Sequence, residues 1–264
     1  MPKSVPPNVS KSFANVIPVI IVILIFNTIR IGFQATSFDN LQYFISTIFQ
    51  IPLVKLGATF PALLITSFLE SVMWLFGING GNIVSSVLQP IWMTLTSENA
   101  TAFASGHVLP NIVNFQFYFK FVKVGGSGAT IGLCLLLLFA SRSAKFKALG
   151  KLSVIPQMFS INEPIIFAIP VVMNPLLIVP FILAPIVLGI IAYIAMAVGL
   201  VPLTNGVTIP WTTPPIISGF LLAGWRGACL NGLQILMSLL TYYPFFRIAD
   251  KIALEKEEEQ ITEK

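Results

Sequence analysis

Long apolar runs separated by short polar segments dominate the chain. Val19–Ile25 contains only Val, Ile and Leu and predicts a first membrane span with its flanking residues. Phe60–Gly77 predicts another span, interrupted only by Glu70, and Gly227–Phe246 predicts the last one. Crossing the hydrocarbon layer takes about 20 apolar residues in a helix. The pattern predicts an all-α integral membrane protein with about five full transmembrane helices.

Two other segments break this pattern in different ways. Between Ser37 and Leu56, apolar residues recur at helical spacing with polar residues between them, which predicts an amphipathic helix along the membrane interface. Ile83–Leu95 is apolar but too short to cross comfortably. Ser97–Asn114 is polar, carries the single histidine, His107, and is expected to be a surface loop.

Two further segments interrupt the apolar pattern with small residues or prolines. In the first, Gly125–Thr130 lies between the aromatic run Phe115–Phe121 and the apolar run Ile131–Ala140. Its small residues would let the backbone approach a ligand or another helix closely, and both explanations stay open. The second comprises Ser160–Phe167 and the proline-rich segment after it, which has room for a half-helix and a full span. This second segment predicts a re-entrant hairpin that carries Glu163.

Glu163 is the strongest candidate for a functional residue. The acidic residues before Arg247 are Asp39, Glu70, Glu98 and Glu163, and only Glu163 is flanked on both sides by long apolar segments broken by Pro and Gly. Pro164 suits the first turn of a helix, which leaves Asn162 and Glu163 at its capping end. Broken helices inside the bilayer mark transporter binding sites. The alternative is a glutamate that caps a helix at the membrane surface and binds nothing.

Two polar segments supply further candidates. Gly77–Asn82 holds three glycines and two asparagines at the end of a span, which indicates either unwound backbone or a simple loop. Thr208–Pro215 is a proline-rich segment with several hydroxyls around Trp211. The Trp211 ring could stack on a sugar or anchor the chain at the membrane interface.

Composition supports the membrane assignment and narrows the chemistry. The 264 residues are 56% hydrophobic and 9% charged, with a mean hydropathy of +0.88. The net charge of +5 is small and scattered, so no nucleic-acid partner is expected. Cys134 and Cys229 lie in apolar runs and are expected to be structural thiols without a disulfide. The glycine-rich segment lacks the Lys-Ser/Thr of a nucleotide-binding loop, and no cofactor or metal is expected.

Charge also predicts the topology. Arg142, Lys145, Lys147 and Lys151 form a basic cluster in a short connection, which the positive-inside rule places in the cytoplasm. The charged segment after Arg247 is expected on the same side, as a helix or as disordered chain. We therefore expect residues 1–249 to form a membrane-embedded transport domain and residues 250–264 a charged cytoplasmic tail.

Several ordered motifs carry a resemblance to a known family. They are Gly77-Ile78-Asn79-Gly80-Gly81-Asn82-Ile83-Val84, the stretch from Gly125 to Gly132, Asn162-Glu163-Pro164-Ile165, Asn174-Pro175-Leu176-Leu177, Pro180-Phe181-Ile182 and Ile209-Pro210-Trp211-Thr212-Thr213-Pro214-Pro215. With these motifs the chain resembles the lactose/cellobiose-type enzyme IIC, the permease of the bacterial phosphoenolpyruvate-dependent sugar phosphotransferase system. The similarity extends over essentially the whole chain. It implies two re-entrant hairpins in the substrate-binding half, which fits the Gly125 and Glu163 segments.

The resemblance implies a homodimeric, multi-pass permease of the bacterial plasma membrane that binds a β-linked disaccharide or oligosaccharide such as cellobiose or lactose. A IIB partner bearing a phosphocysteine then phosphorylates the C6 hydroxyl, so the phosphoryl-carrying residue lies on the partner. Glu163 would accept hydrogen bonds from sugar hydroxyls and orient or deprotonate the reacting one. By analogy the substrate-binding residues are Asn79, Gly80, Asn82, Gly126, Ser127, Asn162, Glu163, Trp211 and Thr212.

Two departures from the family bear on activity. Members of the family are longer, and this chain resembles their carboxy-terminal half, without the amino-terminal helices that supply much of the dimer contact. The family usually has His where this chain has Asn79, and Asn cannot take up a proton near neutral pH. The alternatives are therefore a non-transporting remnant or assembly subunit, and an ion-coupled secondary transporter that uses Glu163 as a proton carrier.

Overall fold

The computed structural model describes residues 7–34, 36–37, 57–169 and 174–262. It divides into two compact units, Met1–Leu53 and Val54–Lys264. In the first unit, helix α1 (Pro7–Gln34) covers the predicted first span. Its apolar side chains from Val19 to Phe26 are about half exposed or more. The amphipathic helix predicted for Ser37–Leu56 falls almost entirely outside the described residues.

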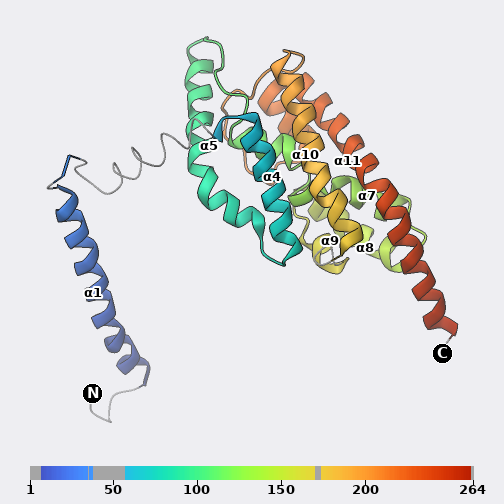
Figure 1. The fold of residues 1–264 in the computed structure, drawn as a ribbon, viewed down its shortest axis with the longest axis horizontal. Coiled ribbons are helices and arrows are strands. Elements are labelled where there is room, and N and C mark those ends of the chain that lie inside the picture. The colour runs from blue at the N-terminus through green and yellow to red at the C-terminus, as the bar shows by residue number, and fades with distance from the viewer. Residues whose placement is uncertain (1–6, 35, 38–56, 170–173, 263–264) are drawn as a thin grey trace. The chain divides into compact units, whose positions relative to one another are not determined.

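All regular elements in the described part of the second unit are helices (Figure 1). Four segments form breaks between longer helices: the short α6, the π-helical turn η2, the 3₁₀ turn η3 and the half-helix α9. The elements in chain order are α4 (Phe60–Leu75), α5 (Gly80–Ala104), α6 (Phe115–Phe117), η2 (Tyr118–Val122), η3 (Ser127–Ala129), α7 (Ile131–Phe139), α8 (Ala144–Met158), α9 (Glu163–Ala168), α10 (Pro175–Ala197) and α11 (Pro215–Thr262).

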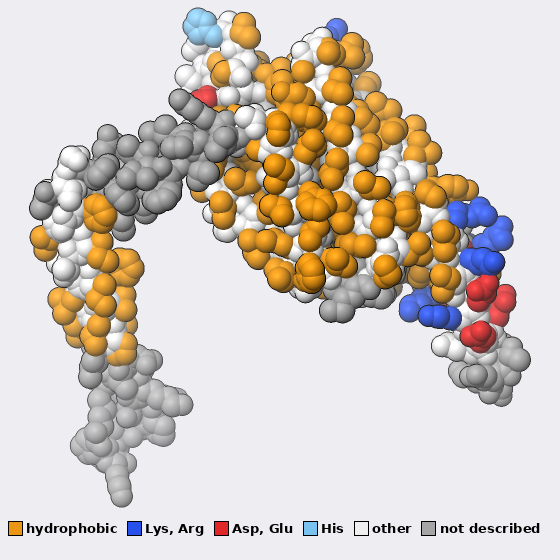
Figure 2. All heavy atoms as spheres, viewed as in Figure 1, with side chains coloured by type: hydrophobic (Ala, Val, Ile, Leu, Met, Phe, Trp, Pro, Cys, Tyr) orange, Lys and Arg blue, Asp and Glu red, His pale blue; other side chains and the backbone are white. Residues whose placement is uncertain are grey.

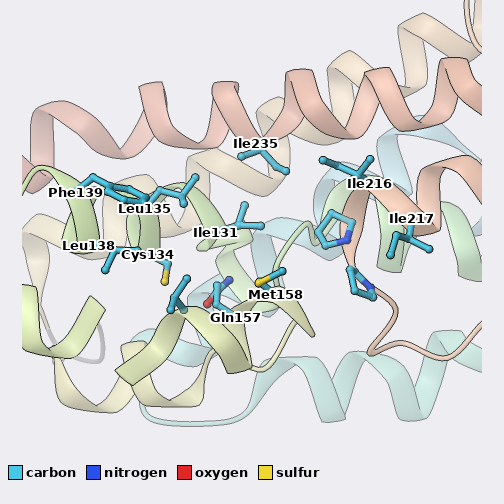
Figure 3. A pocket seen from close by; sticks show the side chains of 13 residues that line it. Ile131, Cys134, Leu135, Leu138, Phe139, Gln157, Met158, Ile216, Ile217 and Ile235 are labelled. Atoms are coloured by element: carbon cyan, nitrogen blue, oxygen red, sulfur yellow. The ribbon is translucent and has the colours of Figure 1, made fainter. Parts of the chain in front are cut away.

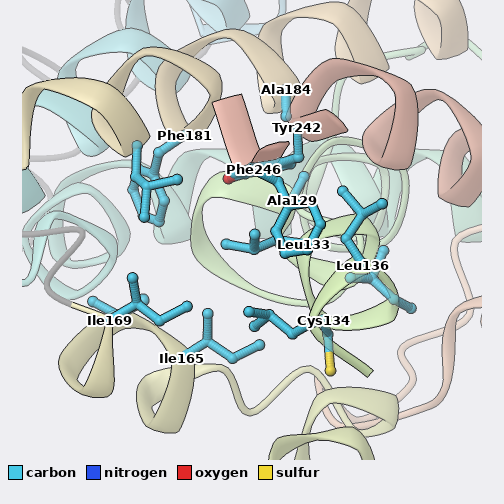
Figure 4. Close-up of a cluster of buried hydrophobic side chains, with 14 of the residues drawn as sticks. Ala129, Leu133, Cys134, Leu136, Ile165, Ile169, Phe181, Ala184, Tyr242 and Phe246 are labelled. Carbon is cyan, nitrogen blue, oxygen red and sulfur yellow. The ribbon is translucent and has the colours of Figure 1, made fainter. Parts of the chain in front are cut away.

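Helix α10 lies at the centre of the packing, against α4 and α11, while α7 packs between α8 and α11. One buried hydrophobic cluster joins α7, α9, α10 and α11; Figure 4 shows Phe181 of α10 and Tyr242 and Phe246 of α11 in it, with Leu133 of α7. A second cluster, around Trp92, joins α4, α5 and η2. Together they hold the breaks at η3 and α9 between full-length helices.

The described residues contain two helices that are long and apolar enough to cross a membrane, Pro175–Ala197 and Pro215–Gln260. A third span results if Phe115–Ala129 and Ile131–Phe139, which are bent by 52° at their junction, count as one. That bend is consistent with the first predicted re-entrant hairpin. Helix α4, with 16 residues, is about 24 Å long and falls short of the bilayer core. The all-α prediction is confirmed, and the count of five spans stays a prediction.

Two predicted connections are wrong because they are helical. The first part of Ser97–Asn114 continues α5 to Ala104. Its hydroxyls bond carbonyls one turn back, as Thr101 Oγ1 does to Ser97 O at 3.0 Å, so a polar sequence is compatible with a helix here. The basic cluster also lies largely on a helix, α8, whose first turn is capped by Ser143 Oγ accepting from Phe146 N.

The last helix is longer than the predicted span. Helix α11 breaks at Ala223 and Gly224, where Gly224 has φ of 66°, and then continues through the charged segment to Thr262. Figure 2 shows hydrophobic side chains over the visible face of the second unit and charged ones gathered at the end of α11. This end helps fix α8, because Glu257 accepts from Ser143 Oγ at 2.6 Å and from Lys145 N at 3.0 Å.

The same end of α11 contacts the segment before α8 as well. Asp250, which is buried, accepts from Arg142 N at 2.9 Å and from Ser143 N at 3.2 Å. The basic segment and the charged tail therefore lie against each other. This contact supports the prediction that they share one side of the membrane, and the assignment of that side to the cytoplasm stays a prediction.

Candidate functional site

A cavity of about 410 Å³ lies where the breaks in the helices meet. Its wall is formed by the α4–α5 junction, one face of α5, the α6–η2 segment, the turns before η3 and α9, and one residue of the α10–α11 connection. The lining residues are Trp74, Asn79, Gly81, Asn82, Ser85, Gln89, Phe115, Phe119, Lys123, Gly126, Ser127, Ser160, Asn162, Glu163 and Trp211.

Most of the residues proposed from the sequence meet at this cavity. Seven of the nine line it: Asn79, Asn82, Gly126, Ser127, Asn162, Glu163 and Trp211. Thr212 is half-buried and does not line it. Gly80 is buried behind the wall, where an added Cβ would lie 2.2 Å from the carbonyl oxygen of Glu70. The glycine at position 80 therefore lets α5 start directly against the backbone of α4.

A buried charged cluster supports one side of the cavity. Glu70 of α4 is 3% exposed, and its Oε1 lies 2.6 Å from Lys123 Nζ and accepts from Ser127 Oγ at 3.0 Å. Its Oε2 accepts from Tyr118 OH at 2.7 Å. Both carboxylate oxygens are thus occupied by donors from the η2–η3 segment. This cluster ties α4 to the first break and places Lys123 at the cavity wall.

The sequence also contains a signal for Glu70, which was not among the predicted site residues. A carboxylate inside an apolar span is costly unless it is paired, which applies to Glu70 as much as to Glu163. Lys123 follows the aromatic run after a π-helical turn, where helical spacing no longer predicts which way a side chain faces. The pairing of Lys123 with Glu70 was therefore not predictable from periodicity.

Asn162 joins the two breaks to each other. Its Nδ2 donates to Ser127 O at 2.6 Å and to Thr130 Oγ1 at 2.8 Å. Gly126, with φ of 94°, lies so close that an added Cβ would be 2.7 Å from Asn162 Oδ1. Asn162 was expected at the capping end of α9, but its side chain makes no capping hydrogen bond there. The amide is used to hold the cavity wall together.

Glu163 and Asn79 keep polar atoms available to a ligand. Glu163 begins α9, with Pro164 in the first turn as predicted, and its side chain is exposed. Within the described part of the chain, its carboxylate has no hydrogen bond or ion pair. Asn79 Oδ1 accepts from Asn82 N at 3.0 Å, capping α5, and Asn79 Nδ2 has no partner among the described residues.

Other lining residues were not proposed from the sequence. Ser85 and Gln89 lie on the same face of α5 as the proposed Asn82, at the spacing i, i+3 and i+7 that places side chains on one side of a helix. Phe115 and Phe119 are paired at 4.5 Å between ring centroids, and Lys123 Nζ lies 5.0 Å from the Phe119 ring. The polar spacing inside Ile83–Leu95 was a readable signal for this face. The wall thus combines hydrogen-bonding groups with aromatic faces.

A second cavity of the same unit differs in chemistry. It has a volume of about 450 Å³ and lies between α7, α8 and the start of α11, with Ile131, Leu135 and Ile216 pointing toward it in Figure 3. Of its lining side chains, only Gln157 carries an amide. Among the described residues, no group of three or more His, Cys, Asp or Glu side chains could hold a metal ion. The polar cavity is therefore the better candidate for a functional site.

Comparisons with known proteins show which family the chain belongs to. A family model described as phosphotransferase system, EIIC, matches residues 1–185. The lichenan permease IIC component of Bacillus subtilis (strain 168) is 43% identical over 259 residues, which are 97% of this chain and 57% of that protein. The cellobiose-specific EIIC component of Geobacillus stearothermophilus is 40% identical over 266 residues, covering 99% of this chain and 59% of that protein.

A solved structure is similar as well. The crystal structure of the transporter ChbC, the IIC component of the N,N'-diacetylchitobiose-specific phosphotransferase system, matches with a TM-score of 0.82 and 40% identity. The match covers 98% of this chain and 60% of that one. The chain thus spans less than two thirds of the length of these relatives. The matched model and the relatives identify the family: the chain belongs to the phosphotransferase system EIIC family.

Proposed function

We propose that this chain is the sugar-binding part of a phosphotransferase-system permease and that the polar cavity binds a β-linked disaccharide or oligosaccharide such as cellobiose or lactose. The observation that carries the proposal is the joint presence of a free carboxylate, a free amide donor and aromatic rings on one cavity wall. Sugars offer hydroxyls for hydrogen bonds and apolar ring faces for aromatic side chains. Relatives named for lichenan and cellobiose support this class of substrate.

Glu163 is the proposed catalytic residue. A IIB partner carries a phosphocysteine; its S–P bond breaks as the C6 oxygen of the sugar forms the new P–O bond. Glu163 orients the C6 hydroxyl and takes up its proton, which leaves the cysteine as a thiolate. Asn79, Asn82 and Trp211 hold the sugar, while Ser127, Asn162 and the Gly126 backbone shape the wall. A relative named the lactose-specific EIICB component of Lacticaseibacillus casei supports a link between C and B components.

The membrane setting is part of the proposal. Residues 1–249 are embedded in the bacterial plasma membrane in several passes, the tail from residue 250 lies in the cytoplasm, and two copies form a homodimer. The apolar helices of the second unit support an embedded domain. Labelling Lys147→Cys or Glu257→Cys with an impermeant thiol reagent from outside intact cells tests the topology on a background in which Cys134 and Cys229 are replaced by Ala. Reaction at either new cysteine would contradict it.

Sugar binding to the purified 264-residue chain tests the function directly. Calorimetric titration should detect binding of cellobiose or lactose, with maltose, the α-linked isomer of cellobiose, as the control that binds more weakly. Failure of both β-linked sugars to bind would overturn the proposal. In cells, sugar uptake that required a proton gradient but no phosphocysteine partner would instead favour ion-coupled transport through Glu163.

A further inference from the structure

We propose that Lys120 is a positioning residue that holds Trp211 at the wall of the cavity. Lys120 belongs to η2, and Trp211 belongs to the segment 208–215 between α10 and α11, 91 residues away in sequence. The consequence for sugar affinity rests on the proposed function. The placement of Trp211 does not, because it concerns the protein without ligand.

The ammonium of Lys120 contacts the backbone of this segment directly. Lys120 Nζ donates to Trp211 O at 2.7 Å and to Thr213 O at 3.0 Å. Lys120 is 3% exposed. No carboxylate of the described residues lies within ion-pair distance of it, whereas Lys123, three residues later, pairs with Glu70 at 2.6 Å. The two lysines of this turn therefore have different partners, one a carboxylate and the other a pair of carbonyls.

A buried ammonium without a carboxylate needs a reason. Removing such a charge from water costs several kcal/mol, and an apolar side chain of similar volume would avoid that cost. The two carbonyl oxygens that accept from Lys120 offset this cost only in part. They belong to the segment 208–215, so the bonds from Lys120 tie that segment to η2. An apolar residue at position 120 could not donate these hydrogen bonds, so it would not hold the segment in position.

The rest of the segment is held in the same manner. Gln116, one turn before Lys120, donates from Nε2 to Ile209 O at 3.4 Å. Within the segment, Thr213 donates from its backbone N and from Oγ1 to Pro210 O, at 3.0 and 2.8 Å. The carbonyls at positions 209, 211 and 213 thus all point to donors on the α6–η2 segment. Together these donors fix the turn that carries Trp211.

The ring of Trp211 depends on this anchoring because little else holds it. Trp211 is 53% exposed and lines the cavity, and its side chain has no hydrogen bond within the described part of the chain. Packing fixes a fully buried ring such as that of Trp92, but it cannot fix a half-exposed one. A stacking ring loses conformational entropy when a ligand binds, and holding its backbone in place beforehand reduces that loss. The sequence left two roles open for Trp211, stacking on a sugar and anchoring at the membrane interface, and its place in the cavity lining supports stacking.

The first experiment measures the position of the ring without ligand. The full chain is labelled with 5-fluorotryptophan, and the Trp211 signal in the ¹⁹F NMR spectrum is assigned with Trp211→Phe. Lys120→Met should shift or broaden the Trp211 signal and leave those of Trp92 and Trp225 in place, which also shows that the variant is folded. Lys120→Arg, which keeps donors, should retain the wild-type signal, and Lys147→Met is the control for loss of an exposed lysine.

The second experiment measures cellobiose affinity in a double-mutant cycle. Lys120→Met should weaken binding about tenfold, the size of one lost directed contact, and Lys120→Arg should restore most of it. In a Trp211→Ala background, Lys120→Met should cause little further loss, because its effect passes through the missing ring. Effects that simply add would show that Lys120 acts independently of Trp211 and would overturn the proposal.

The two measurements separate the possible failures. An unchanged Trp211 signal in Lys120→Met would overturn the proposal, whatever the sugar data show. If the wild-type chain binds neither cellobiose nor lactose, the proposed function fails, and a shifted Trp211 signal in Lys120→Met still supports the positioning role. If Lys120→Met perturbs all the tryptophan signals equally, Lys120 stabilises the whole fold and is not specific for Trp211.

Discussion

Two carboxylates at the cavity differ in their surroundings: Glu70 supports the cavity from behind its wall, whereas Glu163 lines it. Glu70 is buried, and three donors, from Lys123, Tyr118 and Ser127, occupy its oxygens. Glu163 is exposed at the start of a six-residue helix and has no partner among the described residues. Both would be costly if left alone in the membrane. For Glu70 the protein offsets this cost with its own donors. For Glu163 the cost has to be offset by water or by a ligand.

This contrast distinguishes polar groups that stabilise the fold from polar groups that are available to bind a ligand. Polar groups that already have partners, such as Glu70 and the Asn162 amide, hold the broken segments in register. Groups without a partner among the described residues, such as the Glu163 carboxylate and the amide nitrogen of Asn79, gain hydrogen bonds only when water or a ligand enters the cavity. Substitutions of the paired groups should therefore change stability, and substitutions of the unpaired groups should change affinity.

The largest effect is expected at the paired carboxylate. Glu70→Gln keeps the shape of the side chain but leaves Lys123 buried without a counter-charge, so the free energy of unfolding should fall by about 3 kcal/mol. Lys123→Met should have an effect of similar size, because it leaves the Glu70 charge uncompensated. Thermal unfolding in detergent, followed by circular dichroism, measures both.

The double variant Glu70→Gln/Lys123→Met is the control for this prediction. It removes both charges together, so it should lose less stability than the sum of the two single variants. Strict additivity would show that the two charges do not depend on each other. A Glu70→Gln variant with wild-type stability would contradict the contrast between paired and unpaired polar groups.

Sequence patterns predicted the fold class because it depends on features that are local in sequence. Continuous apolar runs such as Val19–Ile25 predict helices, and Pro164 fixes the start of α9 in its first turn. The helical part of Ser97–Asn114 was missed because its hydroxyls bond their own helix. Composition cannot distinguish that arrangement from a solvated loop.

The site was predictable on the side where residues act by their own chemistry. Glu163, Asn79 and Trp211 each stood out as polar or aromatic residues at a break in an apolar run, and all three line the cavity. The side that depends on partners was not predictable, because Lys123 meets Glu70 across 53 residues and after a π-helical turn that changes its facing. Such a pairing is a property of the packed helices and leaves no periodic trace.

The next effect in size is expected at the free carboxylate. Glu163→Gln keeps the shape and removes the charge, so it should weaken cellobiose binding by roughly 1.5 to 3 kcal/mol, the usual worth of a hydrogen bond to a charged group. Thermal stability should stay at the wild-type value, because Glu163 has no partner to lose in the described structure. Calorimetric titration measures the affinity, and undiminished binding would defeat the assignment of Glu163 to the sugar site.

A smaller effect is expected at Asn79. Replacing it with the residue usual in the family, Asn79→His, should leave cellobiose binding equal or strengthen it, because imidazole can also bond a hydroxyl. A cycle with Glu163→Gln tests whether the two side chains meet at one hydroxyl, in which case a coupling of about 0.5 to 3 kcal/mol is expected. Strict additivity in that cycle would argue against a shared contact. Asn79→Ala is the control, since it removes the α5 cap without adding a ring.

The smallest effect is expected at a third carboxylate, Glu257, which has partners like Glu70 but lies at the charged end of α11. Hydrogen bonds from the Ser143 hydroxyl and the Lys145 amide hold the pKa of Glu257 below its ordinary value of 4.5. A carboxyl with a lowered pKa stabilises the folded protein above its ordinary pKa, and that contribution is lost as the pH falls through the lowered value. Because solvent screens it, Glu257→Gln should lower Tm at pH 7 by only about 1–2 °C. The difference in Tm between wild type and variant should shrink when the pH is taken below 4.5. A loss as large as that of Glu70→Gln would show that having partners, regardless of burial, decides how much a carboxylate contributes to stability.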